Sequence, residues 1–105
     1  MILYRPVGQK EYELIAATDF TKFPPRLPEQ PIFYPVLAPE YADQINRQWN
    51  RNGYTLMFEI DDEYANNFPI HQVGAQIHRE LWVPAEELET FNTHKIGKIK
   101  VISRF

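Results

Sequence analysis

A proline-rich segment in the first third of the chain limits most strongly what this sequence can fold into. Residues 20–31 contain Pro24, Pro25, Pro28 and Pro31. Proline fixes φ and disfavours the helical conformation of the residue before it, so this segment cannot be a helix. We expect a stiff, extended loop, and a long ordered loop in so small a chain is often functional. The nine prolines and the 14% aromatic content also argue against a helical bundle.

Strands are expected where short apolar runs alternate with polar residues or end at turn residues. The clearest case is residues 54–60, where Tyr54 and every second side chain after it is large and apolar. This period of two predicts a strand with one buried face. Further strands are predicted at residues 2–5, 32–36, 70–73, 80–83 and 96–105.

Helices are predicted by a different spacing. Residues 39–50 begin at a proline and carry Tyr41, Ile45 and Trp49 at i, i+4 and i+8, which predicts a helix with Tyr41 and Trp49 in the core. Shorter helical segments are predicted at residues 9–18, 61–67 and 85–91. This mixture predicts a single α+β domain over residues 1–105, built around a small sheet and large enough for one core.

Composition excludes several classes of function. The chain has no cysteine, which rules out disulfides, thiolate zinc sites and cysteine nucleophiles, and its one serine makes a serine hydrolase unexpected. The net charge is −3 and the basic residues are spread out, unlike the clustered charge that binds nucleic acid. No apolar run approaches the ~20 residues of a membrane helix, and no signal-peptide pattern occurs. We expect a cytoplasmic protein with neither nucleic-acid nor membrane partners.

The common signatures of phosphate, metal and hydrolase sites are missing. No glycine-rich phosphate loop, GxSxG elbow, HExxH pair or EF-hand loop occurs. The histidines, His71, His78 and His94, are not at the spacing of ligands on one helix. His71 and His78 could meet across a hairpin, but zinc would still need a third ligand, so we expect no metal site.

Two charged residues beside apolar strands are the candidates for a functional site. Glu80 begins a short apolar strand, where a carboxylate must either be paired or take part in chemistry. Arg5 lies on the first strand, and adjacent strands of one sheet would bring it close to Glu80. Both have a structural alternative, Glu80 as an ion-pair partner of Arg79 or a lysine, and Arg5 as the partner of a carboxylate on the same sheet. Tyr34 could likewise be core, and His78 a polar strand residue.

Three segments of the chain form a recognisable pattern: LYRPVG (3–8), FPPRLPEQPIFYPVL (23–37) and ELWVPAEEL (80–88). Together they resemble a family of short bacterial proteins usually labelled ADP-ribosylation/crystallin J1. The resemblance covers nearly the whole chain. The crystallin J1 relatives themselves are large helical ADP-ribosyl-glycohydrolases with paired-aspartate motifs, which this chain lacks. The pattern is more similar to the ADP-ribosyltransferase fold, which implies two small sheets flanked by short helices, with NAD in the cleft between the sheets.

The resemblance also implies roles for four residues. Arg5 matches an arginine of the first strand that contacts NAD, and Tyr34 is the nearest match to a side chain beneath the nicotinamide. Glu80 matches the catalytic glutamate of a later strand. His78 stands two residues before it, where transferases that modify arginine carry Gln or Glu, and is expected to contact NAD.

These residue types suit the chemistry of ADP-ribose transfer. A carboxylate stabilises the oxocarbenium-like sugar that forms as nicotinamide leaves. An arginine holds phosphate or ribose with its fork of donors, and an aromatic ring stacks on nicotinamide. The resemblance therefore implies that NAD, or a related nucleotide, is a substrate, that Arg5 and Glu80 are catalytic, and that ADP-ribose passes to an unidentified acceptor.

Two other functions stay open at this point. One is a non-catalytic binding or interaction module on the same fold, for example the partner of a neighbouring toxin or antidote. The other is a nucleotide or ADP-ribose hydrolase, which agrees with the family label but not with the residues. If Arg5, Tyr34 and Glu80 meet at an open cleft, the transferase is favoured. If Trp82 or the proline-rich segment fills that cleft, the interaction module is favoured.

Overall fold

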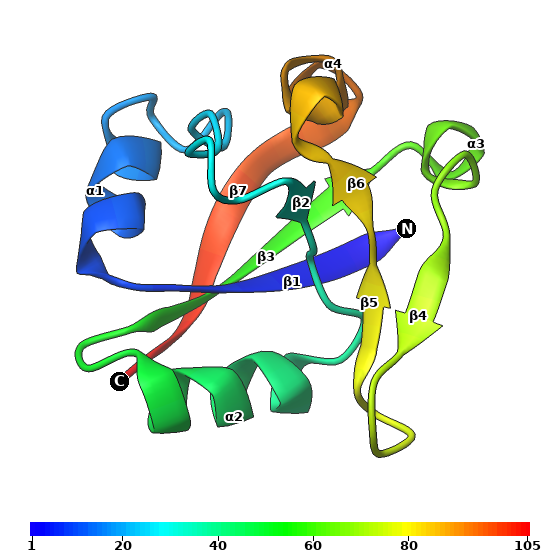
Figure 1. Ribbon diagram of the computed structural model, residues 1–105. Coiled ribbons are helices and arrows are strands. Elements are labelled where there is room, and N and C mark those ends of the chain that lie inside the picture. The colour runs from blue at the N-terminus through cyan, green and yellow to red at the C-terminus, as the bar shows by residue number, and fades with distance from the viewer.

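A three-stranded antiparallel sheet lies at the centre of the molecule in a computed structural model that describes residues 1–105 (Figure 1). In spatial order its strands are β1 (Ile2–Val7), β3 (Tyr54–Ile60) and β7 (Lys95–Arg104). The register places Leu3 opposite Phe58 and Arg5 opposite Leu56. Because opposite residues share a face of the sheet, Arg5 lies on the same face as the core side chains.

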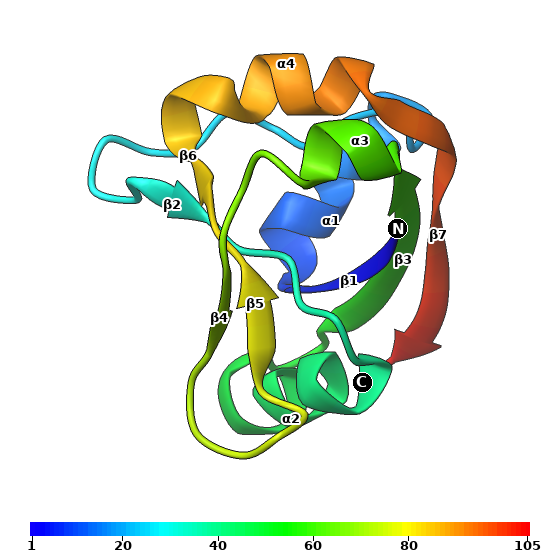
Figure 2. The ribbon, with the colours of Figure 1, turned by 90° about the vertical axis from the view of Figure 1, so that its right-hand side faces the viewer.

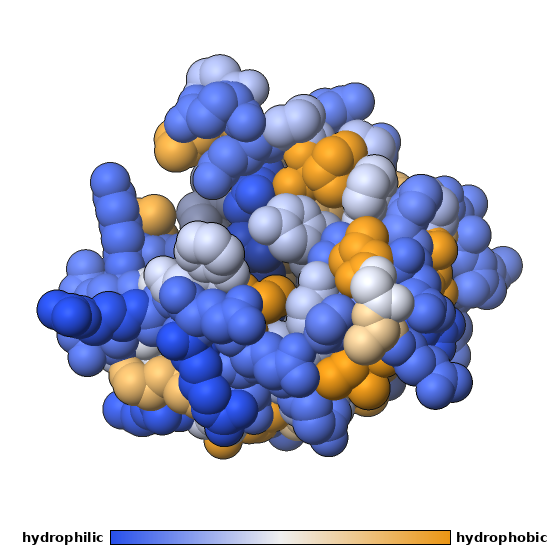
Figure 3. Space-filling model, turned by 60° about the horizontal axis from the view of Figure 1, so that its bottom comes forward, coloured by the Kyte–Doolittle hydropathy of each residue, from blue (hydrophilic) through white to orange (hydrophobic).

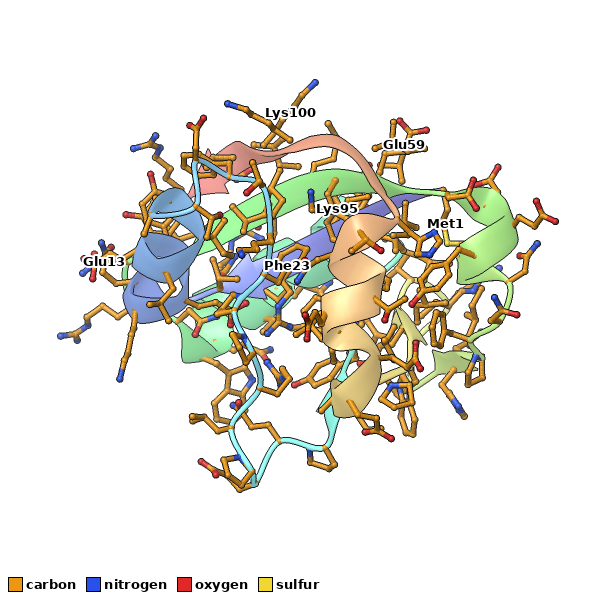
Figure 4. All side chains as sticks on the ribbon, turned by 90° about the horizontal axis from the view of Figure 1, so that it is seen from above. Met1, Glu13, Phe23, Glu59, Lys95 and Lys100 are labelled. Atoms are coloured by element: carbon orange, nitrogen blue, oxygen red, sulfur yellow. The ribbon has the colours of Figure 1, made fainter.

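The two faces of this sheet differ in character. The alternation predicted for β3 is confirmed, since its large apolar side chains are buried on the inner face apart from Tyr54, which is half-buried. Glu59 and Lys100 point away from the outer face, as Figure 4 shows. Thr55 also belongs to the outer face but is fully buried. A helix covers that end of the sheet.

This helix is α2 (Pro39–Trp49), and it packs with other residues than its spacing predicts. Trp49 is 78% exposed, so its predicted place in the core is wrong, and Tyr41 is only half-buried. The fully buried residues are Ala42 and Asn46. The Asn46 amide donates a hydrogen bond of 2.9 Å to the hydroxyl of Thr55. Because Ala42 is small and the Asn46 amide is hydrogen-bonded, this face of the helix can approach the sheet closely. The stripe with Tyr41 and Trp49 therefore does not face the sheet.

The proline-rich segment contains neither helix nor strand, as predicted, and Phe23 anchors it to the core. Its backbone N–H and C=O bond to the side chain of Asn92 at 2.9 and 3.0 Å. Figure 4 shows Phe23 at the centre of the molecule. The helical elements beside it are α1 (Gln9–Ala16), the 3-10 turn η1 (Ala85–Glu87) and α4 (Leu88–Thr93).

Val36 joins β1 to β5 (Arg79–Leu81) across the middle of the molecule. Its backbone N–H and C=O bond to Tyr4 at 2.8 and 2.9 Å, and it also forms a bridge with Glu80. The strands that carry Arg5 and Glu80 are therefore not adjacent, because the extended segment around Val36 lies between them. The side chains of Arg5 and Glu80 nevertheless line the same cleft.

Two short strand pairs and one short helix complete the fold. They are β2 (Ile32–Phe33) with β6 (Val83–Pro84), β4 (Ile70–Gln72) with β5, and α3 (Asp62–Ala65). The strand predicted at residues 80–83 is divided at Trp82 into β5 and β6. Figure 2 shows β4 and β5 running side by side down the edge of the molecule, away from α3. The predicted α+β class is confirmed. None of the helices has the length and apolar character needed to cross a membrane.

Candidate functional site

A cleft of about 630 Å³ opens between β1, the proline-rich segment and α2. Figure 3 shows a hollow on this side of the molecule, bordered mainly by hydrophilic residues. The charged and aromatic residues that line the cleft are Arg5, Glu11, Arg26, Tyr34, Tyr41, Trp49 and Glu80. Arg5, Tyr34 and Glu80, three of the four residues proposed from the sequence, therefore line one cleft. They come from three distant parts of the chain.

Two arginines form one end of the cleft. Arg5 is only 6% exposed, and its Nε and Nη2 atoms donate hydrogen bonds of 2.9 and 3.0 Å to the carboxylate of Glu11. The structural alternative for Arg5 predicted an ion pair with a carboxylate on the same sheet. The observed partner, Glu11, belongs to α1 instead. Arg26 donates from Nη2 to the carbonyl of Ile32 at 3.2 Å, while its buried Nε has no hydrogen-bond partner.

This end of the cleft has an excess of positive charge. Burial lowers the pKa of Arg26, and the nearby positive charge of Arg5 lowers it further. One carboxylate, Glu11, faces the two guanidinium groups. An anion placed between them would balance the charge. Guanidinium forks of this kind match phosphate oxygens in geometry.

A buried carboxylate forms the other end. Glu80 is 8% exposed and accepts hydrogen bonds from the hydroxyl of Tyr41 and from Nε1 of Trp82, the latter at 2.9 Å. None of the ion pairs in the chain includes Glu80, so its pairing with Arg79 or a lysine is not observed. Burying a carboxylate with only neutral donors is costly.

The two donors leave part of the Glu80 carboxylate free. A carboxylate offers about four lone-pair positions, of which Tyr41 and Trp82 use two. Burial raises the pKa of Tyr41, and its hydrogen bond to Glu80 raises it further, so the phenol remains a donor at neutral pH. Glu80 is therefore held in place by groups that keep their protons. Its remaining acceptor positions suit the hydroxyl groups of a ligand.

Aromatic rings lie at the mouth of the cleft. Tyr34 is 39% exposed, and its ring centroid is 6.0 Å from the guanidinium carbon of Arg5. Trp49 is far more exposed and lies on the α2 side of the cleft. Exposed rings beside a polar cleft offer flat surfaces on which a planar ligand ring can stack.

His78, the fourth residue proposed from the sequence, does not line the cleft. Its Nε2 is 2.8 Å from the side-chain oxygen of Gln44, and its ring centroid is 4.5 Å from that of Tyr41. His78 thus supports the ring that binds Glu80. Direct contact between His78 and a ligand in the cleft would require a change in these packing contacts.

Sequence reasoning missed four charged or aromatic residues of the cleft, which are Glu11, Arg26, Tyr41 and Trp49. Tyr41 and Trp49 were assigned to the core because helical spacing shows that residues share a stripe, but not what the stripe faces. Arg26 was not among the predicted site residues, but it is half-buried and lines the cleft. The available signal was an arginine between prolines, where a stiff backbone holds a side chain in position.

The cleft is open to solvent. The proline-rich segment contributes a wall, through Arg26 and Gln30, and does not fill the space. Trp82 lines a different pocket. No three side chains of the metal-binding types come together anywhere in the chain. No protein-family model, curated protein or solved structure matched this chain.

Proposed function

We propose that the protein binds NAD, or a closely related nucleotide, in this cleft and transfers the ADP-ribose group to an acceptor. The proposal is supported by one observation above all. Arg5, Tyr34 and Glu80 line a single open cleft, with positive charge at one end and a buried carboxylate at the other. A dinucleotide has the matching features, which are a diphosphate, planar rings and ribose hydroxyls.

Binding follows from the charges of the cleft. The diphosphate lies at the Arg5 and Arg26 end, where it accepts from the donors that Glu11 leaves free. The nicotinamide ring stacks against Tyr34. The ribose attached to it reaches Glu80, which accepts a hydrogen bond from a ribose hydroxyl.

Glu80 then stabilises the positive charge that develops during transfer. The bond between the anomeric carbon and the nicotinamide nitrogen breaks, and its electron pair leaves with nicotinamide. The sugar becomes oxocarbenium-like, and the nearby carboxylate lowers the energy of this cation. A nucleophilic atom of the acceptor bonds to the anomeric carbon and releases its proton to Glu80, which passes it to water. Tyr41 and Trp82 keep the carboxylate oriented throughout.

A non-catalytic binding module on the same fold is the second candidate. The observation that favours it is the ion pair between Arg5 and Glu11, which occupies two donors of the predicted anchor in the ligand-free chain. In this case the cleft would receive a group of a partner protein, and NAD would not bind.

Calorimetric titration of NAD distinguishes the two. Wild type, Arg5→Ala, Glu80→Gln and Arg79→Ala are compared, with circular dichroism to confirm that each variant folds. Arg79 is the matched control, because it is exposed and next to Glu80 but does not line the cleft. We expect binding to be lost in Arg5→Ala and retained in Glu80→Gln and Arg79→Ala.

Release of nicotinamide, with water as the default acceptor, tests the chemical step. We expect Glu80→Gln to abolish the release while NAD still binds. An absence of binding to wild type at millimolar NAD would reject the transferase and favour the interaction module.

A further inference from the structure

A second pocket, of about 490 Å³, is linked to the cleft by one hydrogen bond between their lining residues. Trp82 lines this pocket, and its indole N–H donates the 2.9 Å hydrogen bond to Glu80, which lines the cleft. The pocket is built from residues on or next to α3, β6 and η1. Figure 1 shows α3 and β6 near α4, at the end of the molecule away from α2.

The lining of this pocket is mainly aromatic. Tyr64, Phe68 and Trp82 contribute rings, and Pro69 and Pro84 add apolar surface. The rings are held by contacts to each other and to their surroundings. Tyr64 and Phe68 pack edge to face with their centroids 5.3 Å apart, and Trp82 stacks on His71 at 4.0 Å. A ligand would therefore meet rings that are already positioned.

The one charged residue of the lining is Glu87. None of the three ion pairs in the chain includes it. Glu87 accepts a hydrogen bond from a neutral donor, the hydroxyl of Tyr64, at 3.3 Å. Burial raises the pKa of Tyr64, and the charge of Glu87 raises it further, so the phenol stays neutral beside the carboxylate. Tyr64 also stacks on His94 with the ring centroids 3.8 Å apart, so Tyr64 and Trp82 each have one face covered by a histidine. The pocket thus combines aromatic rings with a negative charge that no cation of the chain balances.

We propose that this pocket binds a small organic ammonium ion. Aromatic faces attract such cations through the negative potential of their π systems, and Trp is the strongest of the rings. The carboxylate of Glu87 supplies the opposite charge, and the two prolines contact the alkyl groups around the nitrogen. An anion is disfavoured by Glu87, and a metal ion would find only one carboxylate ligand. The proposal does not depend on whether the cleft binds NAD.

Nuclear magnetic resonance of the two indole N–H groups tests this directly. The chain has two tryptophans, so two indole signals are expected, and the Trp49→Phe variant assigns them. Choline is the probe, titrated against sodium chloride at matched ionic strength. We expect the Trp82 signal to shift saturably, with a dissociation constant on the order of a millimolar, while the Trp49 signal does not move.

Two controls separate a cation site from a merely apolar one. Dimethylbutanol, the neutral carbon analogue of choline, is expected to bind about tenfold more weakly. Glu87→Gln should weaken choline binding by about fivefold or more, while Glu86→Gln, which removes the same charge from an adjacent exposed residue outside this pocket, should not.

Four results would overturn the proposal. Three of them are an unmoved Trp82 signal, equal binding of choline and its neutral analogue, and a shift of the Trp49 signal, which would place the cation in the cleft. Retention of full affinity by a folded Glu87→Gln variant would have the same effect.

Discussion

Tyr41 on α2 donates a hydrogen bond to Glu80 on β5, a residue 39 positions further along the chain. This contact ties two walls of the cleft together and, with the hydrogen bond from Trp82, holds a buried carboxylate without any cation. The site therefore depends on neutral donors that keep their protons. Its behaviour should respond to pH and to the loss of either donor.

Tyr41→Phe should change how stability depends on alkaline pH. Burial and the hydrogen bond to Glu80 raise the pKa of Tyr41 above its ordinary 10.0. The stabilisation is fully present below that ordinary value, and it declines at higher pH because the unfolded chain releases the proton first. We expect the free energy of unfolding of wild type to fall more steeply than that of Tyr41→Phe once the pH rises above about 10. Urea denaturation at several pH values measures both slopes, and equal slopes would contradict the expectation.

Trp82→Phe should destabilise the protein much more than Trp49→Phe. The first substitution removes a hydrogen bond to a buried carboxylate, which costs about 2 kcal/mol. The second replaces a side chain that is 78% exposed and makes no hydrogen bond, so we expect a change within about 0.5 kcal/mol. Thermal and urea denaturation of the two variants, side by side, give the comparison. Similar losses in both would argue that the indole–carboxylate bond contributes little.

Arg26→Met should separate stability from binding. Arg26 has a buried Nε without a partner and lies close to the positive charge of Arg5. Replacing it by an apolar side chain of similar length should raise the free energy of unfolding by about 1 kcal/mol. The same change should weaken NAD binding in calorimetry at least tenfold. Arg79→Met is the control for general charge effects, and a destabilised Arg26→Met would show that Arg26 has a structural role.

Asn46→Ala should destabilise the packing of α2 on the sheet. Asn46 is 1% exposed, donates to Thr55 at 2.9 Å and accepts from Asn50 at 3.0 Å. Its loss leaves the buried Thr55 hydroxyl with only its own 2.7 Å hydrogen bond to Asp43 and removes the acceptor of the Asn50 amide, so we expect the free energy of unfolding in urea to fall by about 2 kcal/mol. Gln48→Ala, on the exposed side of the same helix, is the matched control and should be close to neutral. If both variants have the same stability, the buried amide is not what holds the helix.

Much of the secondary structure could be predicted because it depends on local features. The alternation along β3 was enough to predict its buried face. The packing of α2 could not be predicted in the same way. Spacing groups Tyr41 and Trp49 on one stripe, but the neighbouring face with Ala42 and Asn46 fits the sheet more closely.

The candidate site could be predicted only in part. Arg5, Tyr34 and Glu80 were proposed from residue type and resemblance, and they line one cleft. Glu11 as the partner of Arg5 could not be foreseen, because its placement depends on how α1 folds back over β1. Arg26 had a local signal in its proline-stiffened segment, but its place in the cleft depends on how that segment folds back over β1.

By itself the sequence determined the α+β class, the positions of most strands and helices, and the stiffness of the proline-rich segment. These follow from backbone restrictions and from periodicities that each segment carries within itself. Only the tertiary structure decided that Val36 lies between the strands of Arg5 and Glu80, that Tyr41 and Trp82 bind the Glu80 carboxylate, and that Trp82 connects the cleft to a second pocket. These features are contacts between segments distant in sequence, and packing, which local patterns do not specify, brings those segments together.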